Sequence, residues 1–417
     1  MIYSKRKFLF WQRSDMMYCT RKVAEDIYWI GGSDRRLALF ENLFPIPRGV
    51  AYNSYLIMDE KTVVMDTADS SITRQFIENI AHVLNGRPLD YLVVNHMEPD
   101  HCANIEELLV RYPEMKIVGN VKTHNMIRQF YDADLEGRTV TVKEGDTLSL
   151  GKHTLHFFFA PMVHWPEVMV AWEETEKILF SADAFGSFGA LNGNIFNDEV
   201  DFDRDWLADA RRYYTNIVGK YGPQVQNALK KLSALEIKMF CPLHGPIWRS
   251  DLGYLLDKYD KWSRYEPEDR AVVIVYASMY GNTENAVNVL AAELAEAGVK
   301  NIAMYDVSST HVSELIAEVF RCSHLVLAAP TYNNGIYPAM LNFLHDMKAL
   351  NVQNRTVALM ENGSWAPSSG KQMRALLEEM KGMEILEPVL TVKSALKEEA
   401  LDSVKEMADT IAKSLNA

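Results

Sequence analysis

Four side chains that can bind a metal ion lie within six consecutive residues. The stretch from His96 to His101 reads H-x-E-x-D-H and carries two imidazoles and two carboxylates, from His96, Glu98, Asp100 and His101. Imidazole and carboxylate ligands together suit a first-row transition metal without any thiolate. The stretch therefore predicts one side of a metal site. The alternative is an ordinary solvated loop, on which His, Glu and Asp are also common.

Three later residues that can bind a metal also follow strand-like runs, as the H-x-E-x-D-H stretch does. His164, Asp183 and His244 each follow an apolar, strand-like run, at residues 154–160, 177–181 and 237–241. A single histidine after a strand is usually structural. Three potential ligands at strand ends, all C-terminal to an H-x-E-x-D-H loop, favour a shared metal site, because all of them can face the same end of a pair of sheets.

The elements that must position these residues alternate between strand-like and helix-like segments. The H-x-E-x-D-H stretch follows an apolar run that predicts a buried strand and precedes a helix-like segment. Further strands are predicted at residues 51–58, 61–66, 116–119, 139–142 and 168–172, and helices at 71–83, 121–131, 206–221 and 225–232. Sheets interleaved with helices in this order predict an α/β fold in which two sheets lie between helical layers.

A polar, proline-containing segment at residues 263–270 is the best candidate for a linker. After it, strands and helices alternate strictly. The predicted strands are 271–277, 301–305, 324–329, 356–360 and a weaker one at 385–389, and the helices are 283–297, 311–320, 337–347, 368–380 and 398–415. This alternation predicts a doubly wound, five-stranded parallel sheet.

Three loops at the carboxyl ends of these strands carry the residues of a nucleotide site. The first precedes a predicted helix, where backbone N–H groups bind anions, although an ordinary helix cap is the alternative. No G-x-G-x-x-G is present, which favours a mononucleotide over a dinucleotide. We expect Tyr332 and Trp365 to flank a planar ring and the backbone of residues 333–335 to meet its polar edge. The candidate residues are Ser278, Met279, Tyr280, Gly281, Asn282, Thr283, Pro330, Thr331, Tyr332, Asn333, Asn334, Gly335, Asn362, Gly363, Ser364 and Trp365.

Composition limits the class of protein. A chain of 417 residues exceeds what one core normally supports, and we expect an N-terminal extension at residues 1–15 and domains at 16–264 and 265–417. The net charge of −13 argues against nucleic acid or an anionic membrane as the main partner. The four cysteines form no C-x-x-C pair, which fits free thiols in a reducing cytoplasm and indicates that no zinc ribbon or rubredoxin module is built in.

The order of these motifs resembles that of the metallo-β-lactamase fold, whose first motif is normally H-x-H-x-D-H. Here Glu98 replaces the second histidine, which moves the preference from zinc towards iron. The loop at Ser278–Thr283 resembles that of flavodoxins, T/S-x-T-G-x-T, and departs from it at Tyr280. Together the two halves resemble the flavodiiron proteins, over nearly all of residues 18–415.

That resemblance implies a fold, a ligand set and an activity. The fold is an αββα metallo-β-lactamase-like sandwich followed by a flavodoxin-like domain that binds FMN. One iron is bound by His96, Glu98 and His164, the other by Asp100, His101 and His244, and Asp183 bridges them. The implied reaction is reduction of O2 to water or of NO to N2O, with an external electron donor such as rubredoxin and a head-to-tail homodimer.

One segment departs from the family. Some members carry a histidine near the metal pocket, shortly before the sequence that matches Pro47-Arg48-Gly49, where this chain has Glu41-Asn42-Leu43-Phe44. Two other functions stay open at this level. One is a zinc- or iron-dependent hydrolase with an appended flavodoxin domain, and the other is a redox-sensing or electron-carrying module with a vestigial metal site. Metal analysis separates the three.

Overall fold

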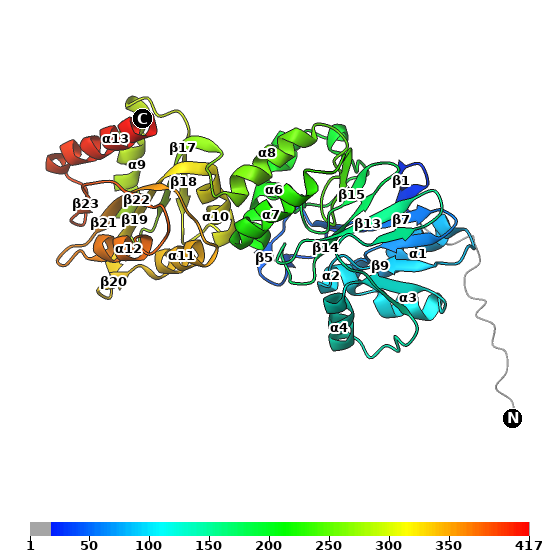
Figure 1. Cartoon of the computed structure of the whole chain (residues 1–417). Helices are drawn as coiled ribbons and strands as arrows, with labels where there is room; N and C mark the ends of the chain where they lie inside the picture. The colour runs from blue at the N-terminus through cyan, green and yellow to red at the C-terminus, as the bar shows by residue number, and fades with distance from the viewer. Residues whose placement is uncertain (1–17, 417) are drawn as a thin grey trace. The chain divides into compact units, whose positions relative to one another are not determined.

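The computed structural model describes residues 18–416, so the predicted extension at residues 1–15 lies outside the described part of the chain (Figure 1). The chain divides into two compact units. The first contains the described residues up to Phe202 together with Ser233–Leu252, and the second contains Asp203–Leu232 and the chain from Gly253 onward. The domain limits predicted from sequence, 16–264 and 265–417, stay predictions.

The first unit is built on two sheets. The larger has the strand order β1-β2-β7-β8-β9-β10-β11 and the smaller β12-β13-β14-β15-β16. The strands of the larger sheet are β1 (Arg21–Ala24), β2 (Ile27–Trp29), β7 (Tyr55–Met58), β8 (Thr62–Met65), β9 (Tyr91–Val93), β10 (Lys116–Gly119) and β11 (Thr139–Thr141). Those of the smaller are β12 (Thr147–Ser149), β13 (Thr154–Phe159), β14 (Met169–Glu173), β15 (Ile178–Phe180) and β16 (Met239–Cys241). Two further sheets have two strands each: β3 (Gly32–Asp34) pairs with β6 (Val50–Tyr52), and β4 (Leu39–Phe40) pairs with β5 (Phe44–Pro45).

Helices connect the parallel strands of the larger sheet. Helix α1 (Thr73–Leu84) links β8 to β9 and ends at Asn85, whose left-handed conformation is a common helix ending. The short helix α2 (Pro99–Cys102) and α3 (Ile105–Arg111) link β9 to β10, and α4 (Val121–Phe130) links β10 to β11. Parallel strands place their carboxyl ends at one edge of a sheet, so the loop after β9 opens at that edge.

The second unit contains the predicted doubly wound sheet. Its order is β18-β17-β19-β21, with β22 and β23 beside β21, and all of these pairs are parallel. The strands are β17 (Asp269–Tyr276), β18 (Ile302–Asp306), β19 (Cys322–Tyr332), β21 (Thr356–Asn362), β22 (Glu384–Ile385) and β23 (Leu390–Val392), and β20 (Gly335–Ile336) pairs antiparallel with β19. The helices are α9 (Asn282–Glu296), α10 (Val312–Arg321), α11 (Pro338–Ala349), α12 (Ser369–Leu377) and α13 (Leu401–Asn416). Counting β22 and β23 as one position, the order is that of flavodoxin-like sheets.

The fifth strand differs from the prediction. A single strand at residues 385–389 was expected, but the chain forms β22 and β23 on either side of residues 386–389. Pro388 lies in the interruption and has no N–H to donate to the neighbouring strand, which explains why the pairing with β21 stops there and resumes at Leu390.

Apolar faces of two helices close one side of this sheet. Val287, Leu290 and Leu294 of α9 and Met407 and Ile411 of α13 are buried with residues of β17, β19 and β21 in one core. In Figure 1 α9 and α13 lie together on one side of the strands, while α11 and α12 lie on the other. This packing holds the strand ends that carry the predicted nucleotide loops.

The predicted linker is not a free tether. Helix α8 (Leu252–Ser263) ends at Ser263, the first residue of the predicted linker, and β17 begins at Asp269, near the linker's end. Between them Glu268 is buried and accepts hydrogen bonds from Arg211 and from Trp262 Nε1, and its carboxylate lies 3.0 Å from Lys258 Nζ. Arg211 belongs to α6 (Leu207–Tyr213), which continues through a π-helical turn, Tyr214–Val218, and the 3-10 turn Gly219–Tyr221 into α7 (Gly222–Leu232).

Among the helices of residues 18–416, none combines the length and the apolar character that a membrane span requires.

Candidate functional site

The seven candidate ligands come from four loops, each at the carboxyl end of a strand. His96 and Glu98 follow β9, and Asp100 and His101 lie in α2 directly after them. His164 follows β13, Asp183 follows β15 and His244 follows β16. None of the seven is more than 9% exposed, so four loops distant in sequence bury imidazoles and carboxylates in one place.

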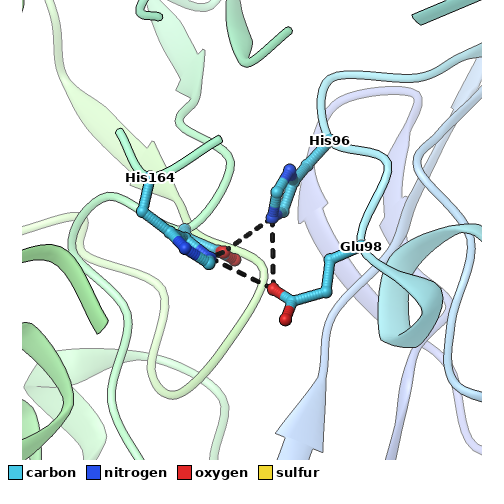
Figure 2. Close-up of side chains that lie close together, drawn as sticks. His96, Glu98 and His164 are labelled. Carbon is cyan, nitrogen blue, oxygen red and sulfur yellow. Dashed lines mark hydrogen bonds and ion pairs between the residues drawn. The ribbon is translucent and has the colours of Figure 1, made fainter. Parts of the chain in front are cut away.

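The first group contains His96, Glu98, His164 and Asp183, whose ligand atoms all lie within 4.8 Å of one another. Glu98 Oε2 lies 3.2 Å from His96 Nε2 and 3.1 Å from His164 Nε2. Figure 2 shows His96 and Glu98 leaving one loop and converging with His164, which comes from the other sheet. Two imidazoles and two carboxylates with converging tips can surround one cation.

The second group contains Asp100, His101 and His244, again within 4.8 Å. The two imidazole Nε2 atoms lie 2.9 Å apart, and each is 3.2 Å from Asp100 Oδ2. Asp183 joins the groups: its Oδ2 lies 3.1 Å from His164 Nε2 and its Oδ1 lies 3.4 Å from His101 Nε2. One carboxylate therefore presents one oxygen to each group.

Burial and charge act against each other at these residues. Burial favours the neutral imidazole, yet the carboxylates of Asp100 and Asp183 raise the pKa of His101 to about 10. Burial likewise opposes charge on His164, but Asp183 and Glu98 raise its pKa to about 9. Burial would raise the pKa of Asp183, but the facing imidazoles hold it well below its ordinary value. The site attracts positive charge, which protons supply when no metal does.

The donor set fits a pair of metal ions. Both carboxylate oxygens of Asp100, and Oδ1 of Asp183, are buried without a hydrogen-bond partner among the described residues. Buried carboxylate oxygens normally accept hydrogen bonds or bind a metal. Because these oxygens point at imidazole nitrogens that cannot all donate to them, metal coordination accounts for the arrangement better than a hydrogen-bond network does.

Two of the four imidazoles have partners for the ring nitrogen that points away from the centre. His96 Nδ1 lies 2.9 Å from Glu167 Oε1, and His244 Nδ1 lies 2.8 Å from the carbonyl oxygen of Ala51. His101 Nδ1 is buried without a hydrogen-bond partner in the described chain. The sequence did not identify Glu167 or Ala51, because neither residue type nor spacing distinguishes an orienting partner from any other buried group.

Glu41 also reaches this centre. It lies in the turn between β4 and β5, in the segment that departs from the family pattern. The residue is exposed, and its carboxyl is close enough to the Glu98 carboxylate for the two charges to act on each other. Desolvation and the Glu98 carboxylate raise the pKa of Glu41 to about 8. The segment that departs from the family pattern therefore brings a carboxyl close to Glu98.

The second site is a cavity of about 540 Å³ at the carboxyl ends of the parallel strands of the second unit. Its lining contains thirteen of the sixteen predicted residues and two that were not predicted, Ala366 and Ser394. The lining residues are Ser278, Met279, Tyr280, Asn282, Thr283, Pro330, Thr331, Asn333, Asn334, Asn362, Gly363, Ser364, Trp365, Ala366 and Ser394. Ser394 lies after β23, so the split fifth strand also delivers a loop to the cavity.

Three predicted residues do not line the cavity. Tyr332 packs edge-on against Tyr337, with ring centroids 6.0 Å apart, and pairs with Gly335 in the β19–β20 hairpin. Gly281 precedes α9 with a φ of +86°, and a Cβ there would meet no atom within 4 Å. Its positive φ, which strains any residue with a Cβ, explains why glycine stands at this turn before the helix. Trp365 lines the cavity and is 90% exposed.

Asn362 connects three walls of this cavity. Its Nδ2 donates to Thr283 Oγ1 at 3.2 Å and to the Ser394 carbonyl at 2.9 Å, while its Oδ1 accepts the Ser394 N–H at 3.0 Å. Ser364 and Ser394 add a contact of 2.6 Å between their hydroxyls. The walls are thus mutually positioned before any ligand is present.

The sequence comparisons agree with this architecture. The family described as "ODP family beta lactamase" matches residues 50–245, and the flavodoxin family matches residues 274–407. A rubredoxin-oxygen oxidoreductase from Megalodesulfovibrio gigas is 32% identical over 95% of this chain and 98% of its own length. A nitric oxide reductase from Moorella thermoacetica is 30% identical over 94% of this chain and 97% of its own. The crystal structure of the flavodiiron protein from Giardia intestinalis superimposes with a TM-score of 0.89 at 25% identity, over 95% of this chain and 97% of that one.

Fold and sites define a class of two-domain proteins in which a metallo-β-lactamase-like domain precedes a flavodoxin domain, as predicted from the sequence. Within that class, the chain belongs to the flavodiiron protein family.

Proposed function

We propose that this chain reduces O2 to water, NO to N2O, or both, at a pair of iron ions that receives electrons through FMN. The observation that carries the proposal is the position of Asp183, which presents one carboxylate oxygen to each of two groups of ligand atoms. The relatives named as an oxygen oxidoreductase and a nitric oxide reductase support the same reactions.

The grouping of atoms supports a specific ligand assignment. We assign His96, Glu98 and His164 to one iron and Asp100, His101 and His244 to the other, with Asp183 as the bridge. Each ion then has two imidazoles, one terminal carboxylate and half of the bridge, which leaves coordination positions for a small ligand. Glu98, in place of the histidine usual in hydrolases of this fold, favours iron over zinc.

The chain's own residues bind and shield the reacting centre. When bound, FMN passes electrons singly, and two irons store two electrons and bind the gas. The four imidazoles supply neutral nitrogen donors, and the three carboxylates offset the metal charge. Trp165 lies edge-on to His96 and Phe40 lies edge-on to His244, each at 5.4 Å between ring centroids, so an aromatic ring packs against one imidazole of each ligand group.

We assign the 540 Å³ cavity to FMN. Replacing Asn362 by alanine removes three hydrogen bonds that join its walls, and we expect FMN affinity to fall roughly 10- to 30-fold, or about 1.4–2 kcal/mol. Titration of the deflavinated protein with FMN, followed by flavin fluorescence, measures this change. Asn301, an exposed asparagine before β18, provides the control: Asn301→Ala should bind FMN like the parent. An unchanged affinity in Asn362→Ala would contradict the assignment.

Partners and assembly follow from the same proposal. The relative named rubredoxin-oxygen oxidoreductase supports rubredoxin or a related carrier as the external electron donor. We expect a head-to-tail homodimer in which the flavin of one chain serves the metal centre of the other. Exposed Tyr280 and Trp365 at the cavity provide aromatic surface for such contacts. The four cysteines are free, which suits the reducing cytoplasm where we expect the protein to act.

The functional proposal is tested by anaerobic reduction of protein loaded with iron and FMN, followed by separate addition of O2 and NO at a gas electrode. We expect rapid consumption of at least one gas, dependent on both cofactors. Protein from which iron has been removed but which keeps FMN is the control and should consume NO no faster than buffer. If loaded protein consumes neither gas, the proposal fails. If it also cleaves a β-lactam or thioester without reductant, the hydrolase hypothesis replaces the proposal.

A further inference from the structure

A buried carboxylate outside the assigned ligand set contacts one of the assigned ligands. Glu167 is 1% exposed and lies three residues after His164, in the sequence His164-Trp165-Pro166-Glu167. Its Oε1 lies 2.9 Å from His96 Nδ1 and accepts the Met97 N–H at 2.9 Å. One carboxylate oxygen therefore contacts both the ring of a ligand and the backbone beside it.

The geometry fixes which nitrogen of His96 is available. A neutral imidazole carries one N–H, and a carboxylate beside Nδ1 favours the tautomer with the hydrogen on Nδ1. Nε2 is then unprotonated, and it is the atom that lies 3.2 Å from Glu98 Oε2 and 3.2 Å from Asp183 Oδ2. Figure 2 shows this nitrogen facing Glu98 and His164, with the other ring nitrogen on the far side of the ring.

Glu167 is itself held in place. Its carbonyl oxygen accepts a hydrogen bond of 2.6 Å from Asn120 Nδ2, and Asn120 caps α4 by accepting the N–H groups of Lys122 and Thr123. On the other side of His96, Asp66 Oδ1 accepts the His96 N–H at 3.1 Å. Buried carboxylates thus hold the backbone on both sides of His96. The carboxylate on the C-terminal side, Glu167, belongs to a residue whose own backbone is held by Asn120, the cap of α4.

We infer that Glu167 is a positioning residue that couples two ligands of the same metal ion. Residues 164–167 supply His164 to that ion directly and hold His96 in the correct tautomer and orientation through Glu167. A carboxylate hydrogen-bonded to a ligating imidazole raises its basicity, and loss of such a partner typically lowers metal affinity about 10- to 100-fold. The inference rests on the diiron assignment above, and extends it to a residue that touches neither the metal nor the gas.

The inference is tested with Glu167→Ala and Glu167→Gln in full-length, FMN-replete protein. Fe²⁺ affinity is measured by competition with a chromophoric chelator, and ⁵⁷Fe Mössbauer spectra distinguish the two ions. We expect Glu167→Ala to weaken one of the two irons about 10- to 100-fold and to change only one of the two spectral components. Glu167→Gln keeps an oxygen that can accept from His96 Nδ1 and Met97 N, and should recover part of that affinity.

A matched control lies in the same unit. Glu174, directly after β14, has its Oε2 2.9 Å from Nε2 of His156 in β13, in a partly exposed pair that includes none of the ligands, so Glu174→Gln should leave both irons unchanged. Unchanged iron affinity in Glu167→Ala would overturn the inference while leaving the diiron proposal intact. Equal weakening of both irons, or equal loss in the Ala and Gln variants, would also overturn it. If the parent protein binds no iron, the diiron proposal itself fails.

Discussion

Asp183→Asn should remove gas reduction and reduce the iron content of the purified protein to less than one ion per chain. Asp183 is 1% exposed, and its two oxygens are directed to different groups of ligands. Asparagine has nearly the same shape, but it replaces one oxygen by an NH2 group that cannot bridge, and it removes a negative charge between two cations. Because loss of a supporting partner alone costs about 10- to 100-fold in metal affinity, loss of the bridge should cost at least about 100-fold.

The measurement combines iron analysis of the purified variant with gas consumption at an electrode. FMN content should stay at the parental level, because the cavity belongs to the other unit. Asp132→Asn, at an exposed carboxylate in the first unit, should behave like the parent in both assays. An Asp183→Asn protein that retains two irons and reduces gas at the parental rate is the result that this account does not allow.

Arg355→Met should destabilise the second unit by about 3–5 kcal/mol. Arg355 is 2% exposed and faces no carboxylate within ion-pair distance among the described residues. Its guanidinium instead donates to the carbonyls of Val319 and Phe320 at the end of α10, and to those of Tyr265 and Gln353. Burial lowers the pKa of Arg355 to about 10. The last carbonyls of a helix carry partial negative charge, which compensates the buried cation.

Methionine fills most of the space but donates no hydrogen bond, so several buried carbonyls lose their partner at about 1–3 kcal/mol each, with partial relief from relaxation. Urea unfolding of the whole chain, with FMN release reporting the second unit, measures the difference. Arg374→Met, at a partly exposed arginine paired with Glu387, should cost less than about 1 kcal/mol. An Arg355→Met midpoint equal to that of the parent would show that these hydrogen bonds contribute nothing net to stability.

The candidate ligands could be predicted from sequence because their signals are local. A strand-like apolar run followed by His, Asp or H-x-E-x-D-H identifies a strand end, and strand ends of one sandwich meet at one edge. Topology predicts that His164, Asp183 and His244 lie near the H-x-E-x-D-H stretch. The structure places His164 and Asp183 with His96 and Glu98, and His244 with Asp100 and His101. Their roles as iron ligands remain predictions until metal is observed.

Features that depend on tertiary packing were not accessible in the same way. The sequence around Glu167 does not indicate a role at the metal site, and only the fold shows that its carboxylate lies beside His96 Nδ1. Ser394 reaches the cavity because the fifth strand resumes after Pro388, which a single weak apolar run does not indicate. Tyr332 makes an edge-on contact with Tyr337 that its place in a loop does not indicate, and its position beside the flavin ring stays a prediction. Each of these outcomes depends on contacts between segments distant in sequence.

The most direct test of the diiron centre is anomalous X-ray scattering from crystals of the purified protein, recorded on both sides of the iron and zinc absorption edges. We expect two iron peaks: one among His96, Glu98 and His164, the other among Asp100, His101 and His244, with Asp183 between them. Zinc at these positions, or a single metal peak with Asp183 bound to one ion only, would contradict the diiron assignment.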